Sequence, residues 1–134
     1  MVAVAADTTR FLAKNGARTP WVSYLALEDS LRRVVGMCAF KGGPDGDRVV
    51  EIAYFTFPGE EGRGVAVAMA AALVRVASTA GPQVASVRAH TLPERNASCR
   101  VLEKVGFLHT GSVVDPEDGP VWRWERSVLD EAAV

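Results

Sequence analysis

The residues with the clearest chemical potential lie in a glycine-spaced turn, EEGRGVA at residues 60–66. The turn follows an apolar, β-branched run at residues 49–57, which predicts a strand, and it opens a run of helix formers. The beginning of a helix leaves about four backbone N–H groups unpaired and carries partial positive charge. Gly62 and Gly64 lack a Cβ, so a ligand can approach the main chain closely, and Arg63 could add a charge-assisted contact. The turn therefore predicts an anion site, typically for phosphate. The alternative is a tight turn with no ligand.

The spacing of the turn excludes two common nucleotide motifs. A P-loop requires Gly-Lys-Ser/Thr, which is absent. The dinucleotide fingerprint requires a third glycine. Any phosphate bound here would therefore belong to another class of ligand.

Composition bounds the remaining possibilities. The chain has 134 residues, enough for one domain with one hydrophobic core, and 49% of them are hydrophobic. The net charge of −1, from 15 basic and 16 acidic residues, favours neither nucleic acid nor an anionic membrane as a partner. Cys38 and Cys99 are expected to be buried thiols of a reducing cytosol, and their spacing from the histidines predicts no metal site. The N-terminus lacks the features of a secretory signal, so we expect a cytoplasmic protein.

The first half of the chain predicts an antiparallel meander. Residues 1–20 are the least informative part, in which Asp7 or Thr8 could cap a short helix that runs through Lys14. Apolar runs separated by turn residues then predict three strands, at residues 21–28, 32–41 and 49–57.

The second half predicts a crossover followed by a second helix and two strands. Residues 65–77 are apolar nearly all round, which predicts a helix buried on more than one side. A strand at residues 84–91 follows, so the strand, helix and strand imply a right-handed parallel crossover. A helix at residues 96–105 ends at Gly106. The last strands are expected at residues 107–114 and 121–126. The order predicts an α/β fold with a mixed sheet in one domain, residues 1–134.

A second motif, RNASCRVLEKVGF at residues 95–107, gives the turn a context. It resembles the N-x-x-S…LEK-x-GF segment of the GNAT acetyltransferase superfamily. Glu61-x-x-Gly64-x-Ala66 resembles that family's Q/R-x-x-G-x-G/A pyrophosphate loop. FKGGPDGDRVVEIAY and AHTLPERNAS resemble its ribosomal-protein N-terminal acetyltransferase (RimJ/RimL-like) branch. The resemblance covers residues 21–127.

The resemblance implies an acyl-CoA N-acyltransferase fold in which the two crossover strands splay apart around acetyl-CoA. The pantetheine arm would pair with the main chain of Phe55, Thr56 and Phe57, and Asn96 and Ser98 would line the thiol end. The pyrophosphate would lie on the backbone N–H groups of Gly62, Arg63, Gly64, Val65, Ala66 and Val67. The implied activity is direct transfer of acetyl from acetyl-CoA to a primary amine in a ternary complex, without a metal. The amine could be a protein N-terminus or a small molecule.

The chain departs from the family pattern at several positions. Glu61 stands where the family has Arg or Gln, and Leu102 stands where many members carry a tyrosine general acid. Asn96 lies two residues before Ser98, where many relatives have three. Residues 1–20 leave no room for the first strand, or for one of the two helices, with which the family usually begins. We therefore expect an acceptor side that is short, open or completed by a second copy in a homodimer.

Three side chains are candidates for proton transfer. Glu51, a lone carboxylate in an apolar strand, is the first candidate for the base, because burial would raise its pKa toward a useful range. His90 is the second candidate, and Ser98 is the expected donor to the leaving thiolate. The alternatives are a surface glutamate, a polar strand end and an ordinary serine in a first helical turn. Two other function classes remain: a catalytically impaired acyl-CoA-binding module that acts through a protein partner, and an interaction domain with no CoA site.

Overall fold

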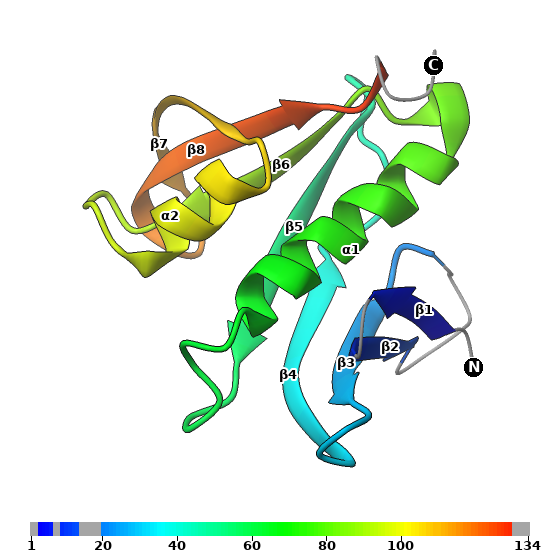
Figure 1. Cartoon of the computed structure of the whole chain (residues 1–134). Coiled ribbons are helices and arrows are strands. Elements are labelled where there is room, and N and C mark those ends of the chain that lie inside the picture. Colours follow the sequence, from blue (N-terminus) through cyan, green and yellow to red (C-terminus); the bar gives the residue numbers. More distant parts are fainter. Residues whose placement is uncertain (1–2, 7–8, 14–19, 130–134) are drawn as a thin grey trace.

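The fold is a single mixed sheet with two helices on one face (Figure 1). The computed structural model describes residues 3–6, 9–13 and 20–129, and the account below concerns these residues. The sheet has eight strands in the order β1-β2-β3-β4-β5-β6-β8-β7. Both helices lie in the second half of the chain, and they pack against each other on that face.

The first five strands form an antiparallel meander. The strands are β1 (Ala3–Ala6), β2 (Thr9–Ala13), β3 (Ser23–Glu28), β4 (Arg33–Phe40) and β5 (Val49–Thr56). The last three confirm the predicted strands, with shorter ends. The predicted antiparallel meander is therefore correct and is longer by two strands.

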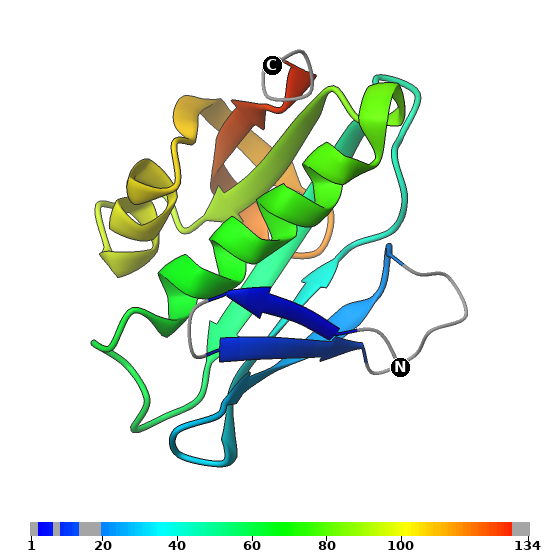
Figure 2. The same cartoon turned by 45° about the vertical axis from the view of Figure 1, so that its right-hand side comes forward.

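The prediction of a short helix from Asp7 or Thr8 through Lys14 is wrong. These three residues lie outside the described ones, but the residues between them are described. Thr9–Ala13 instead forms β2, which pairs with β3 from Thr9↔Glu28 to Ala13↔Tyr24. Figure 2 shows β1 and β2 beyond β3, at the edge of the sheet next to α1. The open edge of β3 offers unpaired backbone groups, and pairing with them outweighs a weak local capping signal. The expectation that residues 1–20 have no room for a first strand is also wrong, because β1 and β2 both lie there.

The predicted crossover is confirmed. Helix α1 (Val65–Thr79) and the short helix η1 (Gly81–Gln83) connect β5 to β6 (Ser86–Thr91), which lies parallel to it. The two strands pair only from Val49↔Ser86 to Ile52↔Ala89, although both continue beyond that point. On its other edge, β6 pairs with β8 along its whole length, from Ser86↔Ser127 to Thr91↔Trp122. The strands therefore splay apart, as the resemblance implies, and Figure 1 shows them diverging behind α1.

The last elements follow the predicted order. Helix α2 (Ala97–Lys104) precedes β7 (Leu108–Asp115) and β8 (Gly119–Ser127), which pair with each other. Gly106 has a φ of 91°, a conformation that suits the glycine expected to end the helix.

The core lies between α1 and the sheet. Its buried side chains on α1 include Met69, Leu73 and Val74, which explains why this helix is apolar nearly all round. Gly36 of β4 allows the close approach, since a Cβ there would lie 2.7 Å from the Phe55 carbonyl oxygen and 3.1 Å from Met69 Cε. Cys38 and Cys99 are buried and not bonded to each other, as expected. Among the residues described, no helix combines the length and apolar character needed to span a membrane.

Candidate functional site

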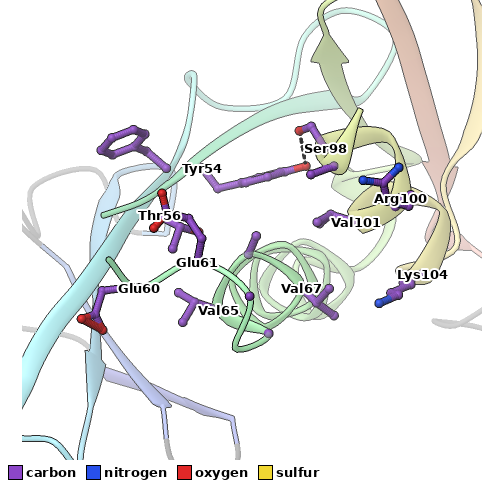
Figure 3. Close-up of a pocket in the computed structure, with 15 residues that line it drawn as sticks. Tyr54, Thr56, Glu60, Glu61, Val65, Val67, Ser98, Arg100, Val101 and Lys104 are labelled. Atoms are coloured by element: carbon purple, nitrogen blue, oxygen red, sulfur yellow. Dashed lines mark hydrogen bonds between the residues drawn. The ribbon is translucent and has the colours of Figure 1, made fainter. Parts of the chain in front are cut away.

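A cavity of about 410 Å³ opens where β5 leaves β6 (Figure 3). Its walls are the end of β5, the loop at residues 60–64, the first turn of α1 and one face of α2. The lining residues are Tyr54, Phe55, Thr56, Glu60, Glu61, Gly62, Gly64, Val65, Ala66, Val67, Ala97, Ser98, Arg100, Val101 and Lys104. The cavity therefore brings together most of the cofactor-binding residues predicted from the sequence.

The edge of β5 that faces this cavity can take up an extended ligand. From Ala53 onward it has no partner in β6. Backbone groups alternate sides along a strand, and the Phe57 N–H donates to the Val35 carbonyl on the β4 side at 2.9 Å. It follows that the backbone groups of Tyr54 and Thr56 face the cavity. By the same alternation, Phe55 and Phe57, which were also predicted to pair with the ligand, direct their backbone groups toward β4. Phe57 does not line the cavity.

The loop leads to an uncapped helix start. Gly62 and Gly64 have φ values of 79° and 83°, so both adopt the left-handed conformation that glycine favours. A Cβ at either position would meet nothing within 4 Å, so space does not require glycine here in the absence of ligand. The backbone conformation requires it. In the described part of the chain, no side chain caps α1 at Gly64. The first N–H groups of α1 therefore remain available to an anion.

Arg63 points away from the cavity, into a network of ion pairs. Its guanidinium lies 2.9 Å from Glu28 Oε2 and 2.6 Å from Glu60 Oε2, and Arg33 contacts Glu60 at 2.6 Å. Hydrogen bonds from Arg33 and Arg63 hold the pKa of Glu60 below its usual range. Arg63 does not line the cavity. The structure therefore places its charge away from the position where a contact with phosphate was expected. The network instead fixes the loop against β3 and β4.

The cations on the cavity wall come from α2. Arg100 and Lys104 are four residues apart and lie on the helix face that lines the cavity, opposite Glu60 and Glu61 (Figure 3). Glu61 Oε1 accepts a hydrogen bond from the Gly59 N–H at 2.6 Å. Sequence reasoning missed the two cations, although their helical spacing was a readable signal.

A second, smaller cavity of about 130 Å³ adjoins the first. It is lined by Lys41, Glu51, Ile52, Ala53, Tyr54, Ala89, His90, Ser98 and Asp118. It therefore brings together Glu51, His90 and Ser98, the three side chains predicted to transfer protons. Tyr54 and Ser98 line both cavities.

Tyr54 is the site residue that sequence reasoning missed most clearly. Its hydroxyl lies 3.1 Å from Ser98 Oγ (Figure 3). This pair stands at the boundary between the two cavities, because both residues line both of them. Burial raises the pKa of Tyr54, so the phenol keeps its proton at neutral pH. The pair can donate a proton to a group that develops negative charge between the cavities.

Glu51 lies in a polar setting. Its side chain is 26% exposed, and its Oε2 atom lies 3.3 Å from Lys41 Nζ and 3.6 Å from His90 Nδ1. The sequence pattern predicted an apolar setting for this carboxylate, and the contact with Lys41 was not predicted. Partial burial opposes the charge of Lys41, but Glu51, Asp118 and Asp115 raise the pKa of its ammonium above the usual value.

His90 is held in one neutral form. Its side chain is 8% exposed, and burial lowers the pKa of its imidazole. Arg123 Nε donates to His90 Nε2 at 3.2 Å, which places the ring proton on Nδ1. Nδ1 is buried 3.9 Å from Asp115 Oδ1, without a hydrogen-bond partner among the residues that the structure describes. In this arrangement His90 can donate toward Glu51 but has no free lone pair with which to act as a base.

Asn96 has a structural role. Its Oδ1 accepts a hydrogen bond from the Cys99 N–H at 3.1 Å, so the side chain caps α2. It lines neither cavity, unlike Ser98. Leu102, at the position where many relatives carry a tyrosine, is fully buried in the core.

Solved structures share this fold. An acetyltransferase of the GNAT family from Bacillus anthracis has a TM-score of 0.68 and 20% identity over 79% of this chain and 66% of its own. The RimL ribosomal L7/L12 alpha-N-protein acetyltransferase, in complex with coenzyme A, has a TM-score of 0.70 and 16% identity over 81% and 62%. The aminoglycoside acetyltransferase AAC(6')-Ib, in complex with coenzyme A and kanamycin, has a TM-score of 0.68 and 20% identity over 84% and 71%. The chain thus spans 66% and 62% of the length of the first two.

Sequence comparison identifies the family. No curated protein matches the chain in sequence. The profile of the acetyltransferase (GNAT) domain, however, matches residues 3–108, which include the glycine-spaced loop and the whole of α2. The chain therefore belongs to the GNAT acetyltransferase family.

Proposed function

We propose that the chain binds acetyl-CoA in the larger cavity and transfers its acetyl group directly to a primary amine that enters the smaller one. One observation carries this proposal: the two cavities meet at the Tyr54–Ser98 pair, with an uncapped helix start on one side and Glu51 on the other. The binding of coenzyme A by two of the similar proteins supports it.

The parts of the cofactor have natural places in the larger cavity. The pyrophosphate lies on the N–H groups at the start of α1, with Arg100 and Lys104 as the nearby cations. The pantetheine arm runs along the free edge of β5, as an added strand would. This brings the thioester to Tyr54 and Ser98.

The side chains of the smaller cavity can manage the protons of the reaction. A primary ammonium must lose a proton before it attacks, and Glu51 takes that proton. The C–N bond forms, the C–S bond breaks, and the Tyr54–Ser98 pair donates a proton to the leaving thiolate. The nitrogen gives up its second proton, which restores the pair. His90 Nδ1–H faces Glu51 at 3.6 Å, without a hydrogen bond to its carboxylate. Positioning of the two substrates supplies much of the remaining acceleration.

The acceptor belongs to the primary amines. The similar proteins include enzymes named for a ribosomal-protein N-terminus and for an aminoglycoside. We propose the same two classes, a protein N-terminus or a small amine, for this chain. The acidic groups Glu51 and Asp118 of the cavity suit either of these cations.

A second candidate is an acyl-CoA-binding module with impaired transfer, which acts through a protein partner. Leu102 in the place of the family tyrosine, and the pairing of Glu51 with Lys41, favour it. The Tyr54 hydroxyl favours an active enzyme over an impaired module, because it supplies a proton donor that the Leu102 side chain cannot supply.

The experiment is thiol release from acetyl-CoA with a panel of amines: peptides with different N-termini, aminoglycosides and polyamines. Glu51→Gln and Tyr54→Phe are expected to lower turnover by about 100-fold each, while acetyl-CoA still raises the melting temperature. Glu125→Gln is the matched control, because this carboxylate pairs with Arg88 at 2.8 Å and lines neither cavity. Binding without turnover on any amine would favour the impaired module. Full activity of Glu51→Gln would remove Glu51 as the base.

A further inference from the structure

Lys41 is a primary amine that the chain itself places in the smaller cavity. Its backbone N–H donates to the Glu51 carbonyl at 2.8 Å, so the two residues lie side by side at the ends of neighbouring strands. Its Nζ lies 3.3 Å from Glu51 Oε2. The side chain lines the cavity together with Tyr54 and Ser98.

This position matches the place assigned to an acceptor. An acceptor amine must contact the base and face the thioester end of the cofactor. Lys41 Nζ contacts Glu51, and the cavity that it lines is bounded by the Tyr54–Ser98 pair. The side chain is 40% exposed, so it has freedom to move within the opening.

We propose that Lys41 is a site of self-acetylation, modified by acetyl-CoA bound in the larger cavity. The proposal rests on the function proposed above. Glu51 takes a proton from the Lys41 ammonium, and the free amine attacks the thioester carbonyl carbon. The C–N bond forms, the nitrogen loses its second proton, and the C–S bond breaks. The CoA thiolate takes a proton from the Tyr54–Ser98 pair, and the second proton from the nitrogen restores that pair. The products are therefore Nζ-acetyl-lysine, CoA and the one proton that Glu51 releases to water.

Two consequences follow from the shared cavity. An external amine competes with Lys41 for Glu51 and for the thioester, so a good acceptor slows self-acetylation. The modification also removes the positive charge that pairs with Glu51, which leaves Glu51 and Asp118 in the cavity without that cation. Self-acetylation therefore takes place when acetyl-CoA is present and the acceptor is absent.

The other lysines serve as references within the same chain. They are Lys14, which lies outside the described residues, and Lys104. Lys104 also lines the larger cavity, but it lies six residues after Ser98 on α2, or about 9 Å along the helix axis at ~1.5 Å per residue. Chemical acetylation by the thioester would modify exposed lysines without regard to Glu51.

The test is a time course of the full chain with acetyl-CoA, read by intact mass and by peptide mapping. We expect a single acetyl group at Lys41, at a rate at least about tenfold above that at Lys104. Glu51→Gln is expected to lower the rate at Lys41 by about 100-fold, and Glu125→Gln to leave it unchanged. The urea-unfolded chain, incubated with acetyl-CoA, gives the background of chemical acetylation. In Lys41→Arg the amount of singly acetylated chain should fall to that background. An accepted amine should slow the labelling.

Equal labelling of Lys41 and Lys104, or labelling of Lys41 that does not depend on Glu51, would overturn the proposal. The melting temperature with acetyl-CoA and amine turnover are measured on the same samples. If acetyl-CoA binds and amines turn over but Lys41 stays unmodified, self-acetylation is wrong and the proposed function stands. If acetyl-CoA neither binds nor labels Lys41, both are wrong.

Discussion

Replacement of Asn96 separates a structural role from a role in binding the cofactor. The side chain caps α2, a helix of eight residues, by accepting a hydrogen bond from the Cys99 N–H at 3.1 Å. Loss of such a cap costs about 1 kcal/mol, within a range of about 0.5–2. For a chain of this length, that corresponds to a fall of about 4 °C in melting temperature. We therefore expect Asn96→Ala to melt about 4 °C below the wild type.

The matched variant is Asn96→Asp. Aspartate caps helices about as well as asparagine, and its charge is favourable at a helix N-terminus. The melting temperature of Asn96→Asp should therefore stay close to that of the wild type. Since Asn96 lines neither cavity, the stabilisation by acetyl-CoA should also be unchanged.

Thermal unfolding with and without acetyl-CoA checks both expectations in one assay. The reasoning would be refuted if Asn96→Ala melted like the wild type and Asn96→Asp lost the response to acetyl-CoA. That pattern would support a contact between Asn96 and the thiol end of the cofactor, as the resemblance to the family implies.

Three further predictions concern charge and burial. Arg100→Ala and Lys104→Ala should each weaken CoA about 2–5-fold in calorimetric titrations, and the loss should shrink at high salt because both cations are exposed; equal losses at low and high salt would argue against a charge contact. Burial lowers the pKa of His90 below its unfolded value, so the unfolded chain takes up the proton first as the pH falls through about 6.5. Stability is then lost from about pH 6.5 down to the folded pKa, and His90→Gln should lack this component in urea unfolding at about pH 7.5 and 5.5; an identical pH dependence would contradict it. Burial raises the pKa of Cys38 to about 12, so a thiol reagent should modify it only after unfolding; rapid labelling of the native chain would exclude the buried placement.

Local patterns in the sequence account for most of the fold. The strand before the glycine-spaced turn, the apolar helix after it and the glycine that ends α2 are each defined by residues within one or two turns of each other. Gly62 and Gly64 were picked out from the sequence for close approach of a ligand. Their positive φ values show that the backbone itself requires them. The strand β2 was missed, because its partner β3 lies beyond residue 22 and no local pattern reveals that pairing.

The candidate site was harder to predict, because its contacts join distant parts of the chain. Tyr54 and Ser98 are 44 residues apart, and Arg33 and Glu60 are 27 residues apart. A strand pattern predicts that Tyr54 lies on one face of β5, but it does not predict which residues contact that face. The same reason explains Arg63, whose charge was expected at the phosphate and lies instead between two glutamates.

The most direct test of the central claim is a titration of the wild-type chain with acetyl-CoA, followed by thermal unfolding, with CoA and ATP in parallel. At about a hundred times the dissociation constant, a ligand that binds only the folded chain stabilises it by about 2.7 kcal/mol. For a chain of this length that is a rise of several degrees. The two cavities predict this rise with acetyl-CoA and CoA but not with ATP, which lacks the pantetheine arm that pairs with β5. Failure of both CoA ligands to stabilise the chain, or an equal effect of ATP, would contradict the assignment of the larger cavity to acetyl-CoA.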